Sequence, residues 1–200
     1  KCSQDPIYFI ENYCYIVTID HGLQLFKLYD CQKNKVNVIH NNRRVILMEG
    51  RQQGKTTTSA AYILWYTLFQ PNKNVAILAN KATAAREVLD RYQTMYEMLP
   101  TWMQQGVTTW NKGDIELENG SKVFTAATGK SGIRGKTVNL LYVDEAAIIP
   151  NNVAEEFFTS VYPTISAGQT SKILLSSTPL GYNHFWKFWN DAEKGRNGFV

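Results

Sequence analysis

The chain has 200 residues, of which 44% are hydrophobic, and it carries a formal net charge of +4 at pH 7. A chain of this length can bury one good core, alone or with a small appendage, and the composition is ordinary for a globular protein. No stretch approaches the roughly 18 uninterrupted apolar residues that a membrane-spanning helix needs, which excludes a protein of that kind.

The N-terminal residues, the cysteines and the charge indicate the compartment and the kind of partner that the protein has. Residues 1–6 lack the apolar segment of a signal peptide, and the three cysteines match neither metal-ligand nor redox spacing, so we expect free thiols in a reducing cytosol. The mild positive charge fits a polyanionic partner or simply a solvated surface. Because the first residue is Lys1 rather than methionine, we expect a piece of a longer protein.

Aromatic side chains are frequent in residues 1–42, and the turn signal Asp20-His21-Gly22 divides this segment. We expect an N-terminal arm or lid of mixed structure here, joined to a core at residues 43–200. An unbroken apolar run predicts that the core begins with a strand at residues 43–48, buried on both faces.

Helices and strands then alternate along the chain. Residues 55–70 carry apolar side chains at helical spacing until Pro71 ends the pattern, so we expect a helix that packs one face on the sheet. A short apolar strand at residues 74–79 and a long amphipathic helix at residues 85–99 follow. This alternation predicts a mostly parallel sheet covered by helices on both sides.

The pattern changes in the second half of the chain. Two alternating runs flank Asn119-Gly120, which is the strongest hairpin signal that a short stretch can offer. The later expected elements are a basic glycine-rich loop at residues 128–136, a buried strand at residues 138–143, a helix at residues 153–160, a strand at residues 172–175, and a closing aromatic helix with Phe185, Phe188 and Trp189 on one side.

Residues 49–57 have the layout of a phosphate-binding loop, because they join an apolar strand to a helix and contain two glycines. In such a loop, backbone N–H groups and the positive end of the helix dipole face the phosphates. Lys55 would reach the β- and γ-phosphates, and Thr56 would offer its hydroxyl to Mg²⁺. The motif GxxxxGK(S/T) has glycine where this chain has Glu49, so the alternative is an ordinary strand–helix turn. The residues expected to contact nucleotide are Gly50, Arg51, Gln52, Gln53, Gly54, Lys55, Thr56 and Thr57.

Two further strands end in residues suited to nucleotide chemistry. Asp144 and Glu145 follow the strand at residues 138–143, at the end where ligands bind in open α/β sheets. Asp144 would hold Mg²⁺, usually through water, and Glu145 would orient and deprotonate the water that attacks the γ-phosphate. The alternative for this pair is a solvated strand end.

Three hydroxyls follow the strand at residues 172–175, namely Ser176, Ser177 and Thr178. Such residues often form turns. After two earlier strands that end in nucleotide chemistry, we favour a sensor that changes its hydrogen bonds when the γ-phosphate leaves.

The segments GRQQGKTTT, LLYVDEAA and LLSSTP, in this order, resemble the ATPase domain of the large terminase subunit of tailed bacteriophages and related viruses. Further agreement lies in FKLYDCQ, AILANK, EVLDR, WNKG and GYNHF, which together span nearly the whole chain. In that family the first loop position is often not glycine, and an arginine commonly stands where Arg51 does. The resemblance implies an α/β P-loop NTPase fold of the ASCE, RecA-like kind, with a mainly parallel central sheet flanked by helices and a β-hairpin insertion.

The resemblance also implies roles for single residues. Those that match are Lys55 and Thr56 for the phosphate and Mg²⁺ contacts, Asp144 for the metal-side aspartate, Glu145 for the catalytic glutamate, and Ser176, Ser177 and Thr178 for the motif that couples hydrolysis to movement. Gln32 matches the glutamine that reads adenine, and the alternative for it is a surface glutamine in the arm.

Two arginines are candidates for the catalytic arginine finger. Arg51, inside the loop, could reach the γ-phosphate in cis, whereas Arg134, in the glycine-rich loop, could act on the nucleotide of a neighbouring subunit in a ring. The alternative for Arg134 is a simple phosphate or DNA contact.

The resemblance therefore implies a motor that binds ATP and Mg²⁺ and couples hydrolysis to translocation of double-stranded DNA into a procapsid. It also implies a portal protein, a small terminase subunit and a homo-oligomeric ring as partners, no membrane, a place in the host cytoplasm on the procapsid, and a nuclease domain beyond residue 200. Two alternatives stay open. One is a helicase- or translocase-type ATPase, which needs a second similar domain, and the other is a nucleotide-binding assembly module without turnover.

Overall fold

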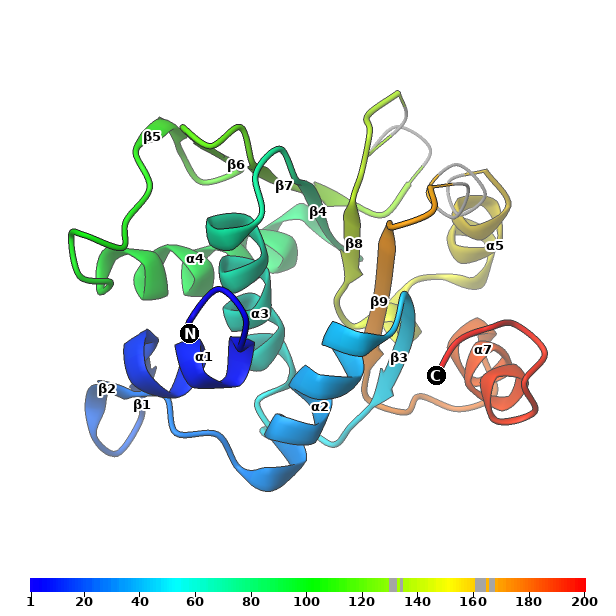
Figure 1. Ribbon diagram of the computed structural model, residues 1–200. Coiled ribbons are helices and arrows are strands. Elements are labelled where there is room, and N and C mark those ends of the chain that lie inside the picture. Colours follow the sequence, from blue (N-terminus) through cyan, green and yellow to red (C-terminus); the bar gives the residue numbers. More distant parts are fainter. Residues whose placement is uncertain (130–132, 134, 161–164, 166–167) are drawn as a thin grey trace.

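The computed structural model of the chain describes residues 1–129, 133, 135–160, 165 and 168–200 (Figure 1). The helices are α1 (Pro6–Tyr13), α2 (Asp30–Asn41), α3 (Lys55–Phe69), α4 (Ala82–Glu97), α5 (Asn151–Ser160) and α7 (His184–Glu193), with a short 3-10 helix η1 (Ala146–Ile148). The strands are β1 (Tyr15–Thr18), β2 (Gly22–Leu25), β3 (Arg44–Met48), β4 (Asn74–Ala79), β5 (Val107–Trp110), β6 (Asp114–Leu117), β7 (Lys122–Ala127), β8 (Leu140–Val143) and β9 (Lys172–Ser177). No helix in these ranges is both long and apolar enough to cross a membrane.

Within the described residues, seven strands form the central sheet in the order β3-β9-β8-β4-β7-β6-β5, and β1 and β2 form a separate hairpin. The first five of these strands run parallel, whereas β6 pairs antiparallel with β7 and β5 pairs antiparallel with β6. The predicted mostly parallel sheet is therefore confirmed. The hairpin around Asn119 and Gly120 is confirmed as well, and because β7 also pairs with β4, this hairpin widens the main sheet.

β9 lies between β3 and β8, so the carboxyl ends of these three parallel strands meet at one edge of the sheet. The strand is two residues longer than its apolar pattern indicated, because Ser176 and Ser177 pair with the end of β3. The expectation that the strand stops before the hydroxyls is thus wrong for both serines. They can be fully buried in the strand because each hydroxyl has a hydrogen-bond partner nearby.

The two faces of the sheet carry separate hydrophobic clusters, because successive side chains of a strand point to opposite faces. Along β4, Val75 and Ile77 pack in a cluster with α1, α2, α3 and α4, whereas Ala76 and Leu78 pack in a cluster with η1, α5 and α7. Figure 1 shows the first four helices on one side of the sheet and α5 and α7 on the other. Helices therefore cover both faces, as the alternating pattern predicted.

α3 is buried on nearly all sides, so the expectation that it packs one face on the sheet is wrong. It contacts α1, α2 and α4 in addition to the sheet (Figure 1). The side of α3 that faces these helices bears aromatic residues. Nε1 of Trp65 donates to the carbonyl of Cys2, whereas the buried hydroxyl of Tyr62 has no hydrogen-bond partner among the described residues. The segment 1–42 contributes Phe9 and Val36 to the same core. Its role as an arm or lid stays a prediction.

Candidate active site

The segment between β3 and α3 is a tight loop that contains two residues in the left-handed region. Gln52 has a φ of 62° and Gly54 a φ of 74°, and a Cβ atom at position 54 would lie 2.6 Å from Nε2 of Gln32. The backbone conformation therefore favours glycine at position 54, and a larger residue would also displace the amide of Gln32. Gly50, Arg51, Gln52 and Gln53 are exposed, and Thr57 is half-buried. An anion at the loop would meet backbone N–H groups and the positive end of the α3 dipole.

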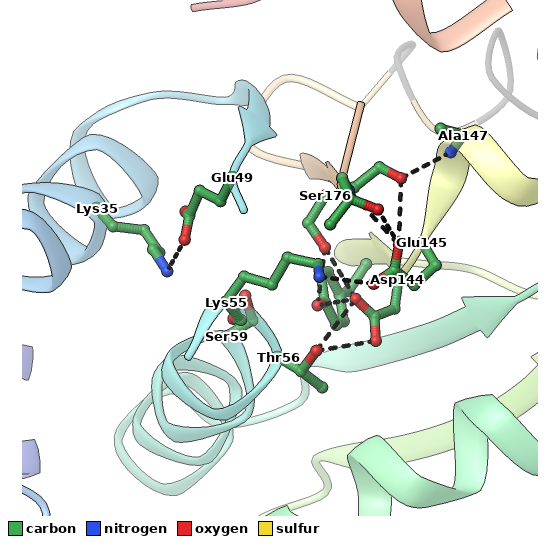
Figure 2. Close-up of polar contacts among 12 residues, drawn as sticks. Lys35, Glu49, Lys55, Thr56, Ser59, Asp144, Glu145, Ala147 and Ser176 are labelled. Atoms are coloured by element: carbon green, nitrogen blue, oxygen red, sulfur yellow. Dashed lines mark hydrogen bonds and ion pairs between the residues drawn. The ribbon is translucent and has the colours of Figure 1, made fainter. Parts of the chain in front are cut away.

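Lys55 and Glu145 form an ion pair across the site, with 2.6 Å between Nζ and Oε1 (Figure 2). The Lys55 side chain is buried, and that of Glu145 is 32% exposed. Burial alone raises the pKa of Glu145, but the hydrogen bond and charge of Lys55, with hydrogen bonds from Thr178 and Ser177, outweigh it and hold the pKa below its ordinary value. Glu145 is therefore ionised at neutral pH, which is the form that a general base needs.

Asp144 is buried and accepts hydrogen bonds from three hydroxyl groups. Oδ1 accepts from Tyr142 at 2.7 Å and from Ser176 at 2.9 Å, while Oδ2 accepts from Thr56 at 3.1 Å. Burial and the charge of Asp144 raise the pKa of Tyr142, so its hydroxyl stays protonated and donates. Tyr142 carries no motif of its own in the sequence, but its position two residues before Asp144 predicts that the two side chains lie on the same side of the strand and its extension.

Thr56 and Asp144 offer hard oxygen ligands suited to a magnesium ion. Their side-chain oxygens lie 3.1 Å apart at the start of α3 and the end of β8. In the part of the chain that the structure describes, no group of three His, Cys, Asp or Glu residues could hold a metal. Magnesium is usually bound by one or two carboxylates together with water and substrate phosphates, so the donors present fit this mode of binding.

The three hydroxyl residues at the end of β9 are divided between the two carboxylates. Ser176 donates to Asp144, whereas the hydroxyls of Ser177 and Thr178 lie 3.3 Å and 3.4 Å from Oε2 of Glu145. The serine and threonine hydroxyls are thus placed where a change at either carboxylate alters their hydrogen bonds.

Glu49 stands where the motif has its first glycine, and it forms an ion pair with Lys35 of α2 (Figure 2). The distance between Nζ and Oε2 is 2.7 Å, and the Lys35 side chain is 4% exposed. The backbone N–H of Glu49 donates to the carbonyl of Ser177 at 3.1 Å. Glu49 therefore ties the start of the loop to α2 and to β9. The sequence alone does not reveal the role of Lys35, because a lysine in a helix gives no signal of a distant partner.

Gln32 lies in the first turn of α2 and uses both ends of its amide inside the protein. Oε1 accepts from the N–H of Tyr29 at 3.1 Å, and Nε2 donates to the carbonyl of Gln53 at 3.1 Å. The side chain is buried, which contradicts the alternative of a surface glutamine. A cavity of about 350 Å³ beside it is bordered by Tyr29, Gln52 and Thr57. Gln32 therefore joins α2 to the loop and faces a space next to that loop.

Of the two candidate arginines, the structure describes only Arg51. Arg51 is exposed and makes no side-chain hydrogen bond or ion pair with any residue in the described ranges. Arg134 lies outside the described residues. The loop, the two carboxylates and the hydroxyls thus meet at one sheet edge, while the finger assignment stays a prediction.

Comparisons with known proteins agree with this arrangement. A family model described as the N-terminal part of the terminase large subunit, T4likevirus type, matches residues 46–197. The large terminase subunit of Thermus phage G20c is 26% identical over 187 residues, which cover 83% of this chain and 38% of that protein.

Two solved structures show the same fold. The large terminase of bacteriophage HK97 has a TM-score of 0.82 at 20% identity, over 99% of this chain and 43% of that chain. The large terminase of a thermophilic bacteriophage, solved in complex with ATP-γ-S, has a TM-score of 0.66 at 15% identity, over 87% of this chain and 44% of that chain. The chain spans less than half the length of these relatives.

Proposed function

The chain belongs to the family of terminase large subunits of the T4likevirus type and matches its N-terminal part, and from this membership we propose that it is the ATP-hydrolysing motor domain of a viral DNA-packaging machine. In this proposal, Mg-ATP hydrolysis drives double-stranded DNA into a procapsid. The terminase of the thermophilic bacteriophage, which binds ATP-γ-S, supports the nucleotide part of the proposal.

The observation that carries the proposal is the meeting of Lys55, Thr56, Asp144 and Glu145 at one edge of the sheet. The 2.6 Å contact between Lys55 and Glu145 and the 3.1 Å contact between Thr56 and Asp144 join residues from α3 to the end of β8. A module that only binds nucleotide needs the loop but not an ionised glutamate beside it. The full set therefore favours turnover.

The chemistry follows from these positions. On binding ATP, Lys55 would exchange the Glu145 carboxylate for the β- and γ-phosphates, while N–H groups of residues 50–57 surround the phosphate chain. The released Glu145 carboxylate would then orient a water molecule and accept its proton as the water attacks the γ-phosphorus, with ADP as the leaving group. Mg²⁺ held by Thr56 and Asp144 would offset negative charge on the phosphate oxygens.

Other residues of the candidate site, beyond Lys55, Thr56, Asp144 and Glu145, receive roles in the same proposal. We assign adenine recognition to Gln32 and coupling to Ser176, Ser177 and Thr178, whose contacts with both carboxylates support it. Arg51 in cis or Arg134 in trans would supply the finger. Residues 43–200 would form the ATPase core and residues 1–42 an arm. The portal protein, the small subunit, a homo-oligomeric ring on a procapsid in the host cytoplasm, and a nuclease domain outside these residues belong to the same proposal.

The test is release of phosphate from ATP, measured with and without Mg²⁺ and with and without double-stranded DNA. We expect Mg²⁺-dependent turnover in the wild type and none in Lys55→Ala. Unchanged turnover in Lys55→Ala would remove the loop from the mechanism, and a wild type that binds ATP without turnover in any of these conditions would contradict a motor.

A further inference from the structure

Glu145 is held in an unusual backbone conformation. Its φ is 50° and its ψ is 46°, which is the left-handed region that residues other than glycine rarely adopt. The residue opens a short turn that continues through Ala146 and Ala147, both of which are buried. A strained turn of this kind persists only where its surroundings fix it.

Side chains from two other elements fix this turn by bonding its backbone. Ser177 at the end of β9 accepts a hydrogen bond from the N–H of Ala147 at 3.0 Å (Figure 2). Nδ2 of Asn183 donates to the carbonyl of Ala147 at 2.9 Å. Nε2 of His184 lies 2.8 Å from the carbonyl oxygen of Ala146.

The two side chains that bond the carbonyls stand together at the start of α7. Asn183 is the N-cap of this helix, because its Oδ1 accepts from the N–H of Trp186 at 3.1 Å. Since a carbonyl oxygen can only accept, the ring of His184 must carry a proton on Nε2 to bond Ala146, and its Nδ1 lies 3.1 Å from the amide oxygen Oδ1 of Asn151. Burial lowers the pKa of His184, although the hydrogen bond with Ala146 acts in the opposite direction.

We propose that Asn183 and His184 are positioning residues for ATP hydrolysis, which hold the turn at residues 145–147 so that the Glu145 carboxylate points at the attacking water. This inference rests on the proposed function. Within the described residues, neither side chain makes a hydrogen bond or ion pair with the loop at residues 49–57. They therefore act through Glu145 and do not weaken the binding of ATP by Lys55. They lie in the segment GYNHF, to which sequence analysis gave no role.

Paired substitutions separate the bonds to the turn from the stability of α7. Asn183→Asp keeps an N-cap acceptor for Trp186 but loses the donor to Ala147. His184→Asn provides an amide only near the position of Nδ1, whereas His184→Gln places its amide nitrogen near that of Nε2 and can still donate to Ala146. Lys187→Gln, at an exposed position of the same helix, is the control.

We expect Asn183→Asp and His184→Asn to lower kcat between about 10- and 100-fold, because a small misplacement of the catalytic group costs that much. The affinities for ATP and ATP-γ-S should not weaken by more than about two-fold, because Lys55 and the loop are untouched and a displaced Glu145 competes less for Lys55. His184→Gln should recover most of the wild-type kcat, and Lys187→Gln should match the wild type.

Wild-type kcat in both Asn183→Asp and His184→Asn would overturn the inference. The inference would also be overturned if these variants lost both ATP affinity and thermal stability and if His184→Gln recovered neither. Asn183 and His184 would then stabilise the folded structure rather than position Glu145. Both outcomes presuppose a wild type that hydrolyses ATP. A wild type without turnover contradicts the proposed function itself.

Discussion

Nζ of Lys55 lies 2.6 Å from Oε1 of Glu145, so the lysine of the loop and the proposed catalytic base neutralise each other across the site. The same lysine is the group that would bind the γ-phosphate. In the proposed function, ATP would therefore compete with Glu145 for Lys55, and binding of the substrate would release the base. Both the affinity for ATP and its turnover should depend on this pair.

Glu145→Gln should keep the binding of ATP and lose most of its hydrolysis. The amide cannot accept a proton from water, and the loss of a positioned base typically costs about 10²–10⁴-fold in rate. Since the competing charge is gone, ATP should bind at least as tightly as to the wild type. Fluorescence titration with a labelled ATP and single-turnover hydrolysis measure the two quantities.

Glu145→Asp serves as the control, because it keeps a base at a shorter reach and should retain part of the rate. Wild-type hydrolysis by Glu145→Gln would place the base elsewhere in the protein.

Acid should destabilise the wild type in part through Glu145. Its pKa is lower in the folded protein than its ordinary value, so its contribution to stability is complete above the ordinary glutamate pKa of about 4.3. The contribution is lost as the pH falls from there through the lower folded-state pKa. Thermal melts between pH 6 and pH 3 should therefore show a smaller decrease in Tm for Glu145→Gln than for the wild type. Parallel curves for the two proteins would contradict the ion pair with Lys55.

Gln32 allows adenine recognition to be separated from support of the loop. Its amide already bonds Tyr29 and Gln53, yet one N–H and one lone pair remain for a base. We expect Gln32→Ala to weaken ATP binding by about ten-fold, as the loss of one or two hydrogen bonds implies, with a smaller effect on GTP. Competition binding with ATP, GTP and inorganic triphosphate measures the preference. Equal weakening for all three would assign Gln32 to the loop alone.

Binding to double-stranded DNA should depend strongly on salt and weakly on sequence. If the domain grips DNA through phosphates, each lysine or arginine contact adds about 0.9 to the slope of log K against log[salt]. The net charge of +4 is consistent with such contacts. Anisotropy titrations with two unrelated duplexes between low and physiological salt test this, and a flat response for either duplex would contradict phosphate-dominated binding.

Sequence periodicity predicted the order of strands and helices, because burial on one or two faces leaves a regular apolar pattern. It did not predict that α3 is buried on nearly all sides, since Trp65 and Tyr62 suit either a core or a surface position. Both are buried here, under helices that the pattern of α3 itself does not reveal. Periodicity within one helix does not predict how that helix packs against elements that are distant in the chain.

The candidate site was predictable to the extent that motifs mark strand ends. Lys55, Asp144 and Glu145 belong to such motifs, and the structure places them together. Lys35 and His184 act through partners 14 and 38 residues away, and nothing in their own sequence context points to those partners. Only the tertiary structure shows that Glu49, a departure from the motif, has a partner.

The pair Lys35–Glu49 predicts that restoring the standard glycine would harm this protein. Glu49→Gly leaves Lys35 buried without its partner, and breaking a buried ion pair in this way costs about 3–5 kcal/mol. Glu49 is 18% exposed and can relax toward water, so Lys35→Met should cost less. The double variant Lys35→Met/Glu49→Gly should recover much of the lost stability, because no buried charge is left unpaired.

Urea unfolding of the four proteins in this cycle gives the coupling energy directly. Lys33→Met is the matched control on the same helix, because the pair of Lys33 with Glu11 is more exposed and should contribute no more than about 1 kcal/mol. A Glu49→Gly variant as stable as the wild type would mean that Lys35 finds another partner or reaches water, and that the glutamate does not anchor the loop.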